Sequence, residues 1–259
     1  MLYRLACALA FSLFAAPAFG IIGGEADGNR HPFVGAIDVR PTGRTIPCTG
    51  TLIAPTVFLT AGHCADFFLS LGITQASVSF DPVFSDLATF HTGTIHLHPG
   101  YRSDPASNRR QDSHDVAVIV FGQAVAGVTP AALPAAGLLD ALGPNALRPQ
   151  AYPVVGFGIS RLLGGRDGGG PRDIDRSSAG TRKTGDWRLM SVTPDWVRFD
   201  MQDARACTGD SGAPNFLGDS RLIVGIGIGG DSNCETMSAN LRVDTPAVRA
   251  FLSQFVTLP

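Results

Sequence analysis

Short apolar stretches, separated by glycine, proline, aspartate and serine, follow one another along most of the chain. Residues 33–39 alternate in the manner of a β-strand, and residues 50–59 have the pattern of a hairpin that Pro55 interrupts. Further strand-like stretches lie at 77–80, 93–97, 116–121, 152–157, 196–201 and 222–228. Many short strands between turn residues are typical of barrels or sandwiches. We therefore predict an all-β chain.

Three segments depart from this pattern. Residues 125–148 are rich in Ala, Gly, Pro and Leu with almost no charge, which predicts a long connection between two halves, with a short helix at 137–142 as an alternative. The glycine-rich stretch 164–171 predicts an exposed loop. A phosphate-binding loop is the more specific functional alternative for this stretch, but no Lys-Ser or Lys-Thr pair follows the glycines at P-loop spacing. Thr245 and Pro246, followed by apolar residues at helical spacing, predict a short C-terminal helix.

The first twenty residues have the features of a secretory signal peptide. Arg4 precedes an apolar run at 5–14 and a small-residue segment at 15–20. The run is too short to span a bilayer, so we expect no membrane anchor and a secreted or periplasmic protein. Cleavage after Gly20 would begin the mature chain at Ile21, and cleavage after Ala18 is the alternative.

Composition narrows the class of protein and the redox compartment. The chain has 44% hydrophobic and 16% charged residues with 31 glycines and 18 prolines, which favours a folded, turn-rich domain. A formal charge of −2 gives no electrostatic reason to expect nucleic acid as a partner. Removal of the signal segment takes away Cys7 and leaves four cysteines, and this even number predicts two disulfides with three pairings open. No Cys-x2-Cys pair supports a zinc site, and we expect no metal.

The stretch 207–214, Cys-Thr-Gly-Asp-Ser-Gly-Ala-Pro, predicts a tight turn that presents Ser211. A serine hydroxyl becomes a useful nucleophile only when a base removes its proton and a further group orients that base. Small neighbours also let a substrate carbonyl approach backbone N–H groups. An ordinary turn without chemistry is the alternative, so the hypothesis requires a histidine and a carboxylate elsewhere.

His63 and Asp115 are the candidates for those two roles. His63 follows an apolar strand and precedes Cys64, where a disulfide would hold it rigidly, whereas the other histidines have no such context. Asp115 stands at the start of the apolar stretch 116–120 and could accept an imidazole N–H. Asp112 is a rival acid, but it lies further from the strand.

At this point the chain resembles the trypsin-like (chymotrypsin-fold) serine proteases, and in particular their secreted bacterial-type members. Four blocks carry the resemblance: Ile-Ile-Gly-Gly at 21–24, Thr-Ala-Gly-His-Cys at 60–64, Asp115 before its strand, and Gly-Asp-Ser-Gly at 209–212. The order His, Asp, Ser separates this family from subtilisin-like enzymes and α/β-hydrolases. The resemblance spans nearly all of the mature chain, 21–259. It implies one protease domain of two six-stranded antiparallel β-barrels with a short C-terminal helix.

The resemblance also implies the roles of individual residues. His63, Asp115 and Ser211 would form the catalytic triad, and the N–H groups of Gly209 and Ser211 the oxyanion hole. A free amino group at Ile21 would pair with Asp210. The implied disulfides join Cys48 to Cys64 and Cys207 to Cys234. The implied partners are a polypeptide substrate and a protein inhibitor, with a monomeric enzyme and no cofactor.

The departures from the family pattern concern specificity. Arg205 stands where trypsins carry the acid that recognises Lys or Arg, and the expected pocket wall includes Ile228 and Gly230. Arg205 facing the pocket would favour an acidic side chain before the scissile bond, since a buried guanidinium needs a partner. Arg205 turned outward would leave a small or apolar pocket. A catalytically silent binding protein on the same fold and an esterase-like acyl hydrolase are the alternative functions.

Overall fold

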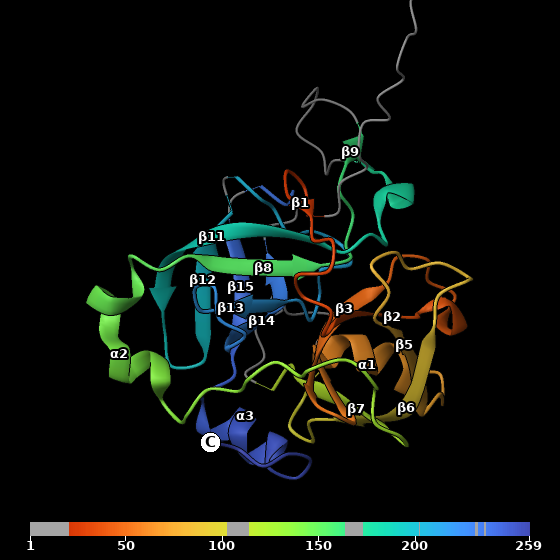
Figure 1. The fold of residues 1–259 in the computed structure, drawn as a ribbon, viewed down its shortest axis with the longest axis horizontal. Helices are drawn as coiled ribbons and strands as arrows, with labels where there is room; N and C mark the ends of the chain where they lie inside the picture. Colours follow the sequence, from red (N-terminus) through yellow and green to blue (C-terminus); the bar gives the residue numbers. More distant parts are fainter. Residues whose placement is uncertain (1–20, 103–113, 164–172, 202, 231–232, 236) are drawn as a thin grey trace, which may run out of the picture.

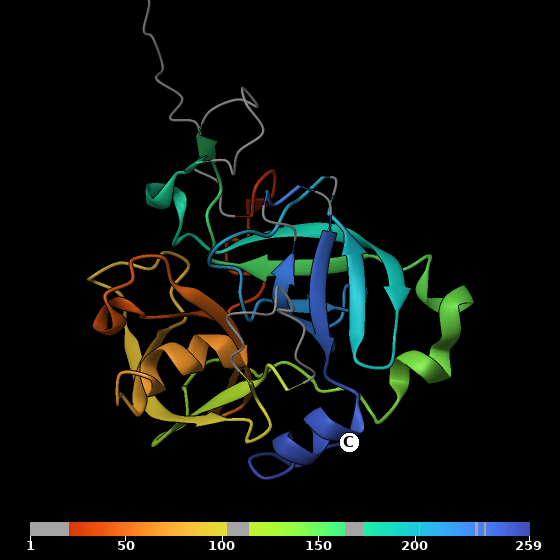
Figure 2. The same cartoon turned by 180° about the vertical axis from the view of Figure 1, so that it is seen from behind.

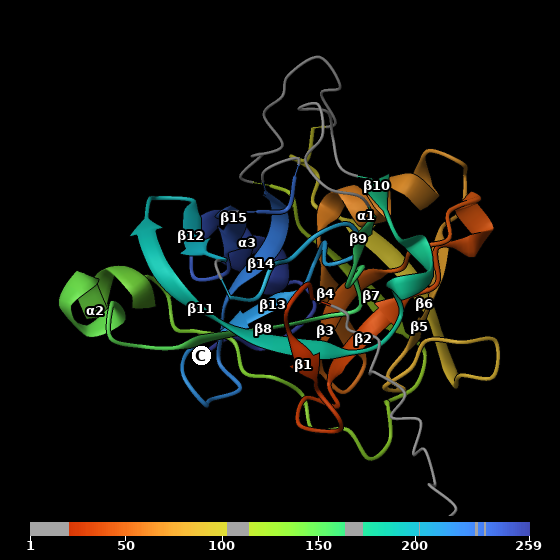
Figure 3. The same ribbon diagram turned by 90° about the horizontal axis from the view of Figure 1, so that it is seen from above.

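The computed structural model describes residues 21–102, 114–163, 173–201, 203–230, 233–235 and 237–259 (Figure 1). The predicted signal peptide at 1–20, the rival acid Asp112 and the predicted glycine-rich loop at 164–171 lie outside these residues. The described chain folds into two closed antiparallel barrels of six strands each, which lie side by side (Figures 1 and 3). The all-β fold with two six-stranded barrels that the sequence and the family resemblance predict is therefore confirmed.

The first barrel contains the strands whose alternation is clearest in the sequence. Its order is β2-β3-β4-β7-β6-β5, and pairing between β5 and β2 closes it. The hairpin expected around Pro55 is formed by β3 and β4. The strands are β2 (Val34–Ile37), β3 (Cys48–Ala54), β4 (Val57–Thr60), β5 (Gln75–Ser79), β6 (Phe90–Leu97) and β7 (Ala117–Phe121).

The second barrel closes through pairings between strands that are far apart in the sequence. β8 pairs with both β11 and β13, so the ring runs β8-β11-β12-β15-β14-β13. A short strand near the N-terminus, β1 (Glu25–Ala26), joins the edge of β11. The barrel strands are β8 (Tyr152–Gly156), β11 (Lys183–Val192), β12 (Trp196–Asp200), β13 (Pro214–Phe216), β14 (Ile223–Gly230) and β15 (Met237–Arg242), and a separate pair is formed by β9 (Leu162–Leu163) and β10 (Asp173–Ile174).

Three α-helices and two short 3₁₀ helices, η1 (Arg40–Thr42) and η2 (Arg176–Ser178), complete the described structure. The first helix, α1 (Gly62–Leu69), follows β4 directly. The connection between the barrels contains α2 (Leu138–Leu147), which lies on the outer side of the second barrel (Figures 1 and 3). The predicted C-terminal helix is α3 (Pro246–Leu252), and the Thr245 side chain caps it by accepting a hydrogen bond from the Val248 N–H. None of the described helices has the length and apolar character needed to cross a bilayer.

Each end of the chain packs on the barrel that lies further from it in the sequence. At the N-terminus, β1 pairs with β11 of the second barrel before the first barrel begins. At the C-terminus, Val248, Phe251 and Leu252 of α3 join a buried cluster that contains the first barrel and part of the second, and the ring of Phe251 lies against His98, which follows β6. Figure 2 draws this helix in dark blue, below the two barrels. The two barrels are therefore held together by both chain ends.

A buried ion pair also links the barrels. Arg182, which immediately precedes β11, donates from Nε to Asp27 Oδ2 at 3.0 Å and from Nη1 to the carbonyl of Phe80 at 2.8 Å. Both charged side chains are fully buried. Burial alone would raise the pKa of Asp27, but hydrogen bonding and charge from His31, together with the charge of Arg182, lower it below its ordinary value. The carboxylate is therefore ionised and paired in the folded chain at neutral pH.

Candidate active site

His63 and Asp115 are brought together by strand pairing and by a helix N-terminus. β4 leads into α1, and its last residue, Thr60, pairs with Ala117 at the start of β7. This places Asp115, which precedes β7, beside the first turn of α1. The backbone N–H of His63 donates to Asp115 Oδ1 at 2.8 Å. Because the first N–H groups of a helix have no partner within the helix, the carboxylate supplies one.

The same carboxylate holds the imidazole ring. His63 Nδ1 lies 2.9 Å from Asp115 Oδ2 and 3.2 Å from Oδ1. Asp115 is 4% exposed, so solvent competes little for these bonds. Gly62 makes this approach feasible, since a methyl group there would lie 3.1 Å from Asp115 Oδ1 and 2.9 Å from the backbone nitrogen of Val116. The contact directs the other ring nitrogen, Nε2, away from Asp115.

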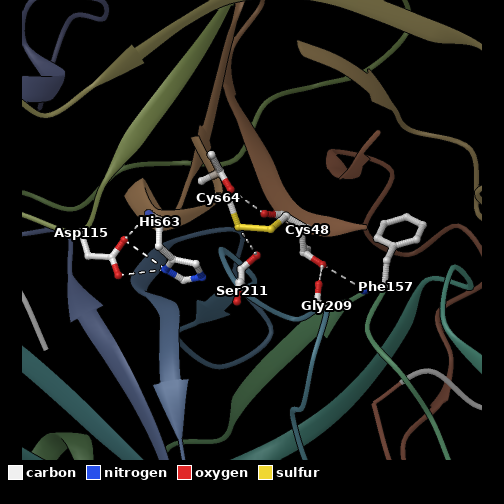
Figure 4. The surroundings of a disulfide bond; sticks show 9 residues. Cys48, His63, Cys64, Asp115, Phe157, Gly209 and Ser211 are labelled. Atoms are coloured by element: carbon white, nitrogen blue, oxygen red, sulfur yellow. Dashed lines mark hydrogen bonds and ion pairs between the residues drawn. A yellow bond between two sulfur atoms is a disulfide. The ribbon is translucent and has the colours of Figure 1, made fainter. Parts of the chain in front are cut away.

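Ser211 lies on a loop that is fixed between the two barrels. Its carbonyl accepts a hydrogen bond from the N–H of Thr49 in β3, and the N–H of Gly212 donates to the carbonyl of Gly227 in β14. Gly212 has a φ of +83°, and a methyl group there would lie 2.2 Å from the carbonyl oxygen of Thr49. In Figure 4 the imidazole of His63 lies between Asp115 and Ser211. The structure therefore brings together the three side chains that the sequence singles out.

The backbone around Ser211 has two N–H groups available to a ligand. Gly209 and Ser211 both line the cavity between the barrels, and in the described part of the chain neither N–H donates to a protein acceptor. In the described part of the chain the Ser211 hydroxyl makes no hydrogen bond to His63. Hydrogen bonds between catalytic side chains are often long until substrate binds. This arrangement provides a hydroxyl, a neighbouring imidazole and two N–H donors at one place.

Both disulfides that the resemblance implies are present, one near each side of the site. Cys48 at the start of β3 is joined to Cys64, the residue after His63. Cys207, which begins the serine loop, is joined to Cys234. The first bridge attaches the helix that carries His63 to the strand that contacts the serine loop (Figure 4). The cross-links therefore restrict the relative positions of His63 and Ser211.

Asp210, next to the serine, is buried against the second barrel. Its carboxylate accepts hydrogen bonds from the N–H groups of Gly158 at 2.9 Å and Cys207 at 3.0 Å. Burial raises the pKa of Asp210 to about 7, although these two donors act in the opposite direction. No basic side chain in the described residues forms an ion pair with it. The side chain of Ile21 is also fully buried, in the core cluster of the second barrel.

The candidate site opens into a cavity of about 940 Å³ that both barrels line. A cavity of this size accommodates a ligand as large as a short peptide segment. Of the residues that the sequence analysis considers for the pocket, Ile228 and Gly230 line this cavity and Arg205 is not among its lining residues. The backbone of Arg205 instead exchanges two hydrogen bonds with Ile22, at 2.8 and 2.9 Å.

Several residues of the site have no signal in the sequence. Arg44 lies over the ring of Phe67, 3.6 Å from its centroid, and both line the cavity. Ser238 and Asn240, which are hydrogen-bonded to each other in β15, also line it. Thr49 contacts the serine loop directly. A search for nucleophiles and bases does not find these residues, because their positions depend on the closure of the barrels.

No set of three or more His, Cys, Asp or Glu side chains in the described structure is arranged to hold a metal ion. His96 lies against the ring of Phe255, and His98 lies against the ring of Phe251.

Comparisons with known proteins agree with this architecture. The Trypsin family model matches residues 21–249. Granzyme M of Homo sapiens is 29% identical over 184 residues, which cover 68% of this chain and 66% of Granzyme M, so the chain spans slightly less than two thirds of that relative. The structure of HL collagenase has a TM-score of 0.67 at 19% identity and covers 90% of this chain and 97% of its own. Neuropsin from mouse brain has a TM-score of 0.64 at 20% identity, covering 89% and 97%. The family match over most of the described residues, on this fold, shows that the chain belongs to the Trypsin family.

Proposed function

We propose that this chain is a secreted serine endopeptidase that hydrolyses peptide bonds through an acyl-enzyme, with His63, Asp115 and Ser211 as its catalytic triad. The observation that carries the proposal is the contact of His63 Nδ1 with the buried carboxylate of Asp115, at 2.9 Å, in a cavity that Ser211 also lines. A buried acceptor on Nδ1 selects the tautomer whose Nε2 is free to take a proton. Membership of the Trypsin family supports the same conclusion.

The proposed reaction has two steps, each assigned to a named group. Ser211 Oγ attacks the peptide carbonyl while His63 Nε2 takes the serine proton, and His63 then gives this proton to the leaving amine. Water hydrolyses the resulting ester by the same route in reverse. Asp115 orients the imidazole and stabilises its charged form. The N–H groups of Gly209 and Ser211 stabilise the negative oxygen of each tetrahedral intermediate, and loss of one such donor typically costs about 3 kcal/mol of barrier.

Activation is proposed to occur by removal of the leader. Ile21 directly follows the expected cleavage point after Gly20, so signal peptidase itself would release its amino group. The buried carboxylate of Asp210 is the proposed partner, because burial raises its pKa to about 7 and a cation would offset that cost. N-terminal sequencing of exported protein tests this step. Full activity in a chain that begins elsewhere than Ile21 would contradict it.

The substrate preference is proposed to be a small or apolar side chain before the scissile bond. Arg205 is absent from the cavity lining, while Ala206, Ile228 and Gly230 contribute to it. This favours the hypothesis that Arg205 does not recognise substrate. A peptide library with acidic, basic and apolar residues at that position tests the proposal, and a preference for Asp or Glu would instead assign Arg205 to the pocket.

The activity itself is tested by peptide hydrolysis with matched variants. The chain beginning at Ile21 should cleave peptides, Ser211→Ala and His63→Ala should abolish cleavage, and Asp115→Asn should lower kcat by about 10⁴-fold. Ser253→Ala, at the exposed end of α3, is the control and should retain full activity. Folded wild-type chain that cleaves nothing would favour a silent binding protein, and cleavage of esters alone would favour an acyl hydrolase.

A further inference from the structure

Thr49 lies where the first barrel touches the loop that carries Ser211. It is the second residue of β3, directly after the disulfide-bonded Cys48, and it is fully buried. Its backbone N–H donates to the carbonyl of Ser211 at 2.9 Å. Its carbonyl accepts a hydrogen bond from the hydroxyl of Thr60 at 2.7 Å. The hydrogen bonds of its own N–H and carbonyl therefore hold Thr49 in position without any contribution from its side chain.

The hydroxyl of Thr49 makes two further bonds, one to the serine loop and one to the residue that follows β8. Oγ1 donates to the carbonyl of Gly209 at 2.9 Å and accepts from the N–H of Phe157 at 3.0 Å. In Figure 4 these bonds are the two dashed lines that end at Gly209 and at Phe157. A hydroxyl has one proton to donate, so the N–H of Phe157 and the carbonyl of Gly209 together orient it completely. The hydroxyl thus links the first barrel, the end of β8 and the serine loop.

Gly209 is a residue of the loop that depends on such a restraint. Its φ is +103°, and a methyl group there would lie 2.6 Å from the Cα of Gly158, so the position requires glycine. Glycine has the widest backbone freedom, and rotation about its bonds would turn its N–H away from the cavity. The carbonyl of Thr208 is held by the N–H of Ile159 at 2.9 Å, and Thr49 holds the carbonyl of Gly209. Because peptide units are planar, the Thr208 carbonyl and the Gly209 N–H turn together, and the bond from Thr49 holds the next peptide unit, so the two bonds restrain the backbone on both sides of the Gly209 Cα.

We propose that Thr49 is a positioning residue that holds Gly209, and with it the N–H that faces the oxyanion, in place through the hydrogen bond from its hydroxyl to the Gly209 carbonyl. The inference rests on the proposed peptidase function, because it concerns a donor of the proposed oxyanion hole. It assigns to Thr49 a part in stabilising the transition state without contact with substrate. The hydroxyl is therefore required for kcat more than for substrate binding.

The test compares Thr49→Val with Thr51→Val in the chain beginning at Ile21. Both threonines are fully buried in β3, but the hydroxyl of Thr51 has no hydrogen-bond partner in the described structure, so it is a matched control. Loss of a complete oxyanion donor costs about 10²–10³-fold in kcat, and a misdirected donor costs less. We expect Thr49→Val to lower kcat by about 10–100-fold with little change in KM. Thr49→Ser should restore kcat to within about threefold, because it keeps the hydroxyl.

Binding of a peptide aldehyde distinguishes positioning from general damage to the fold. When the aldehyde binds, Ser211 Oγ bonds to its carbonyl carbon, the serine proton passes to His63, and the former carbonyl oxygen carries the negative charge in the oxyanion hole. Thr49→Val should weaken this inhibitor about 10–100-fold and leave the affinity for the corresponding product peptide unchanged. Thermal unfolding confirms that each variant is folded, and Thr49→Ala replaces Thr49→Val if the valine variant does not fold.

The outcomes separate this inference from the proposed function. A wild-type chain that neither cleaves peptide nor binds the aldehyde would overturn the proposed function and the inference with it. An active wild type whose Thr49→Val variant matches Thr51→Val in kcat and in aldehyde affinity would overturn the inference alone. An equal loss of aldehyde and product binding would also overturn it, since that result indicates a structural role only.

Discussion

The buried carboxylate of Asp210 should make the stability of the chain depend on whether the amino group of Ile21 is free. The perturbation is acetylation of the Ile21 amine, which removes its charge without changing a side chain. Without that charge, burial raises the pKa of Asp210 from 3.8 to about 7. At about 1.36 kcal/mol per unit, ionising the buried carboxylate then costs on the order of 4 kcal/mol.

The direction of the pH effect follows from proton binding. Between pH 3.8 and about 7 the folded acetylated chain holds the Asp210 proton while the unfolded chain releases it, so stability falls as pH rises through this window. Roughly 3 kcal/mol of the loss falls between pH 5 and pH 8. With a free Ile21 ammonium beside the carboxylate, the pKa of Asp210 is lower and the loss is much smaller.

Urea unfolding of four chains at pH 5 and pH 8 measures this effect. The free and acetylated chains are each compared with their Asp210→Asn counterparts, which removes the contributions of all other titrating groups. The acetylated chain should lose about 3 kcal/mol more than its Asn variant between the two pH values. Equal pH dependence in the free and acetylated chains would refute the proposed pair of Ile21 and Asp210.

Three further predictions concern stability and local geometry. Gly212→Ala should abolish activity and destabilise the chain by more than the roughly 1–3 kcal/mol that backbone strain costs, because the added methyl group would also clash with the carbonyl of Thr49. Gly127 has a similar φ of +74° but open space around it, so Gly127→Ala is the control that measures backbone strain alone. Urea unfolding of both variants checks the difference. Asp27→Asn should cost about 3–5 kcal/mol at pH 7. The deficit should shrink below pH 3.8, because the carboxyl of the unfolded wild-type chain then takes up a proton that the folded carboxyl, with its lower pKa, does not bind; denaturation at pH 7 and pH 3 checks it. Replacing Cys48 and Cys64 by alanine should cost about 3 kcal/mol in urea unfolding, and an unchanged midpoint would contradict this estimate.

The strands that the sequence predicts are short apolar stretches between turn residues, and those of the first hairpins are almost entirely buried. Residues 33–39, 50–59 and 93–97 predict β2, the β3–β4 hairpin and β6 to within a few residues. The longest strand, β11 (Lys183–Val192), is missed because charged residues such as Asp186 and Arg188 interrupt its apolar positions. Its pairing with β8 across the closed barrel stabilises it, and this contact is distant in the sequence.

The helix that carries His63 is missed for a similar reason. α1 is short, and its first turn is capped by Asp115, 52 residues further along the chain. The local sequence therefore lacks the signal that begins the helix. His63, Asp115 and Ser211 can be singled out from the sequence because the chemistry requires these residue types in recognisable surroundings. Thr49 could not be singled out from the sequence, since its proposed role depends on a contact between barrels that only the folded chain creates.

Labelling with a serine-directed organophosphonate tests the proposed triad most directly. The chain beginning at Ile21 should gain the mass of one phosphonyl group, located at Ser211 by peptide mapping, and His63→Ala should gain none in the same time because its serine is not activated. Label on another residue, or equal labelling of folded wild-type and His63→Ala chains, would contradict the account.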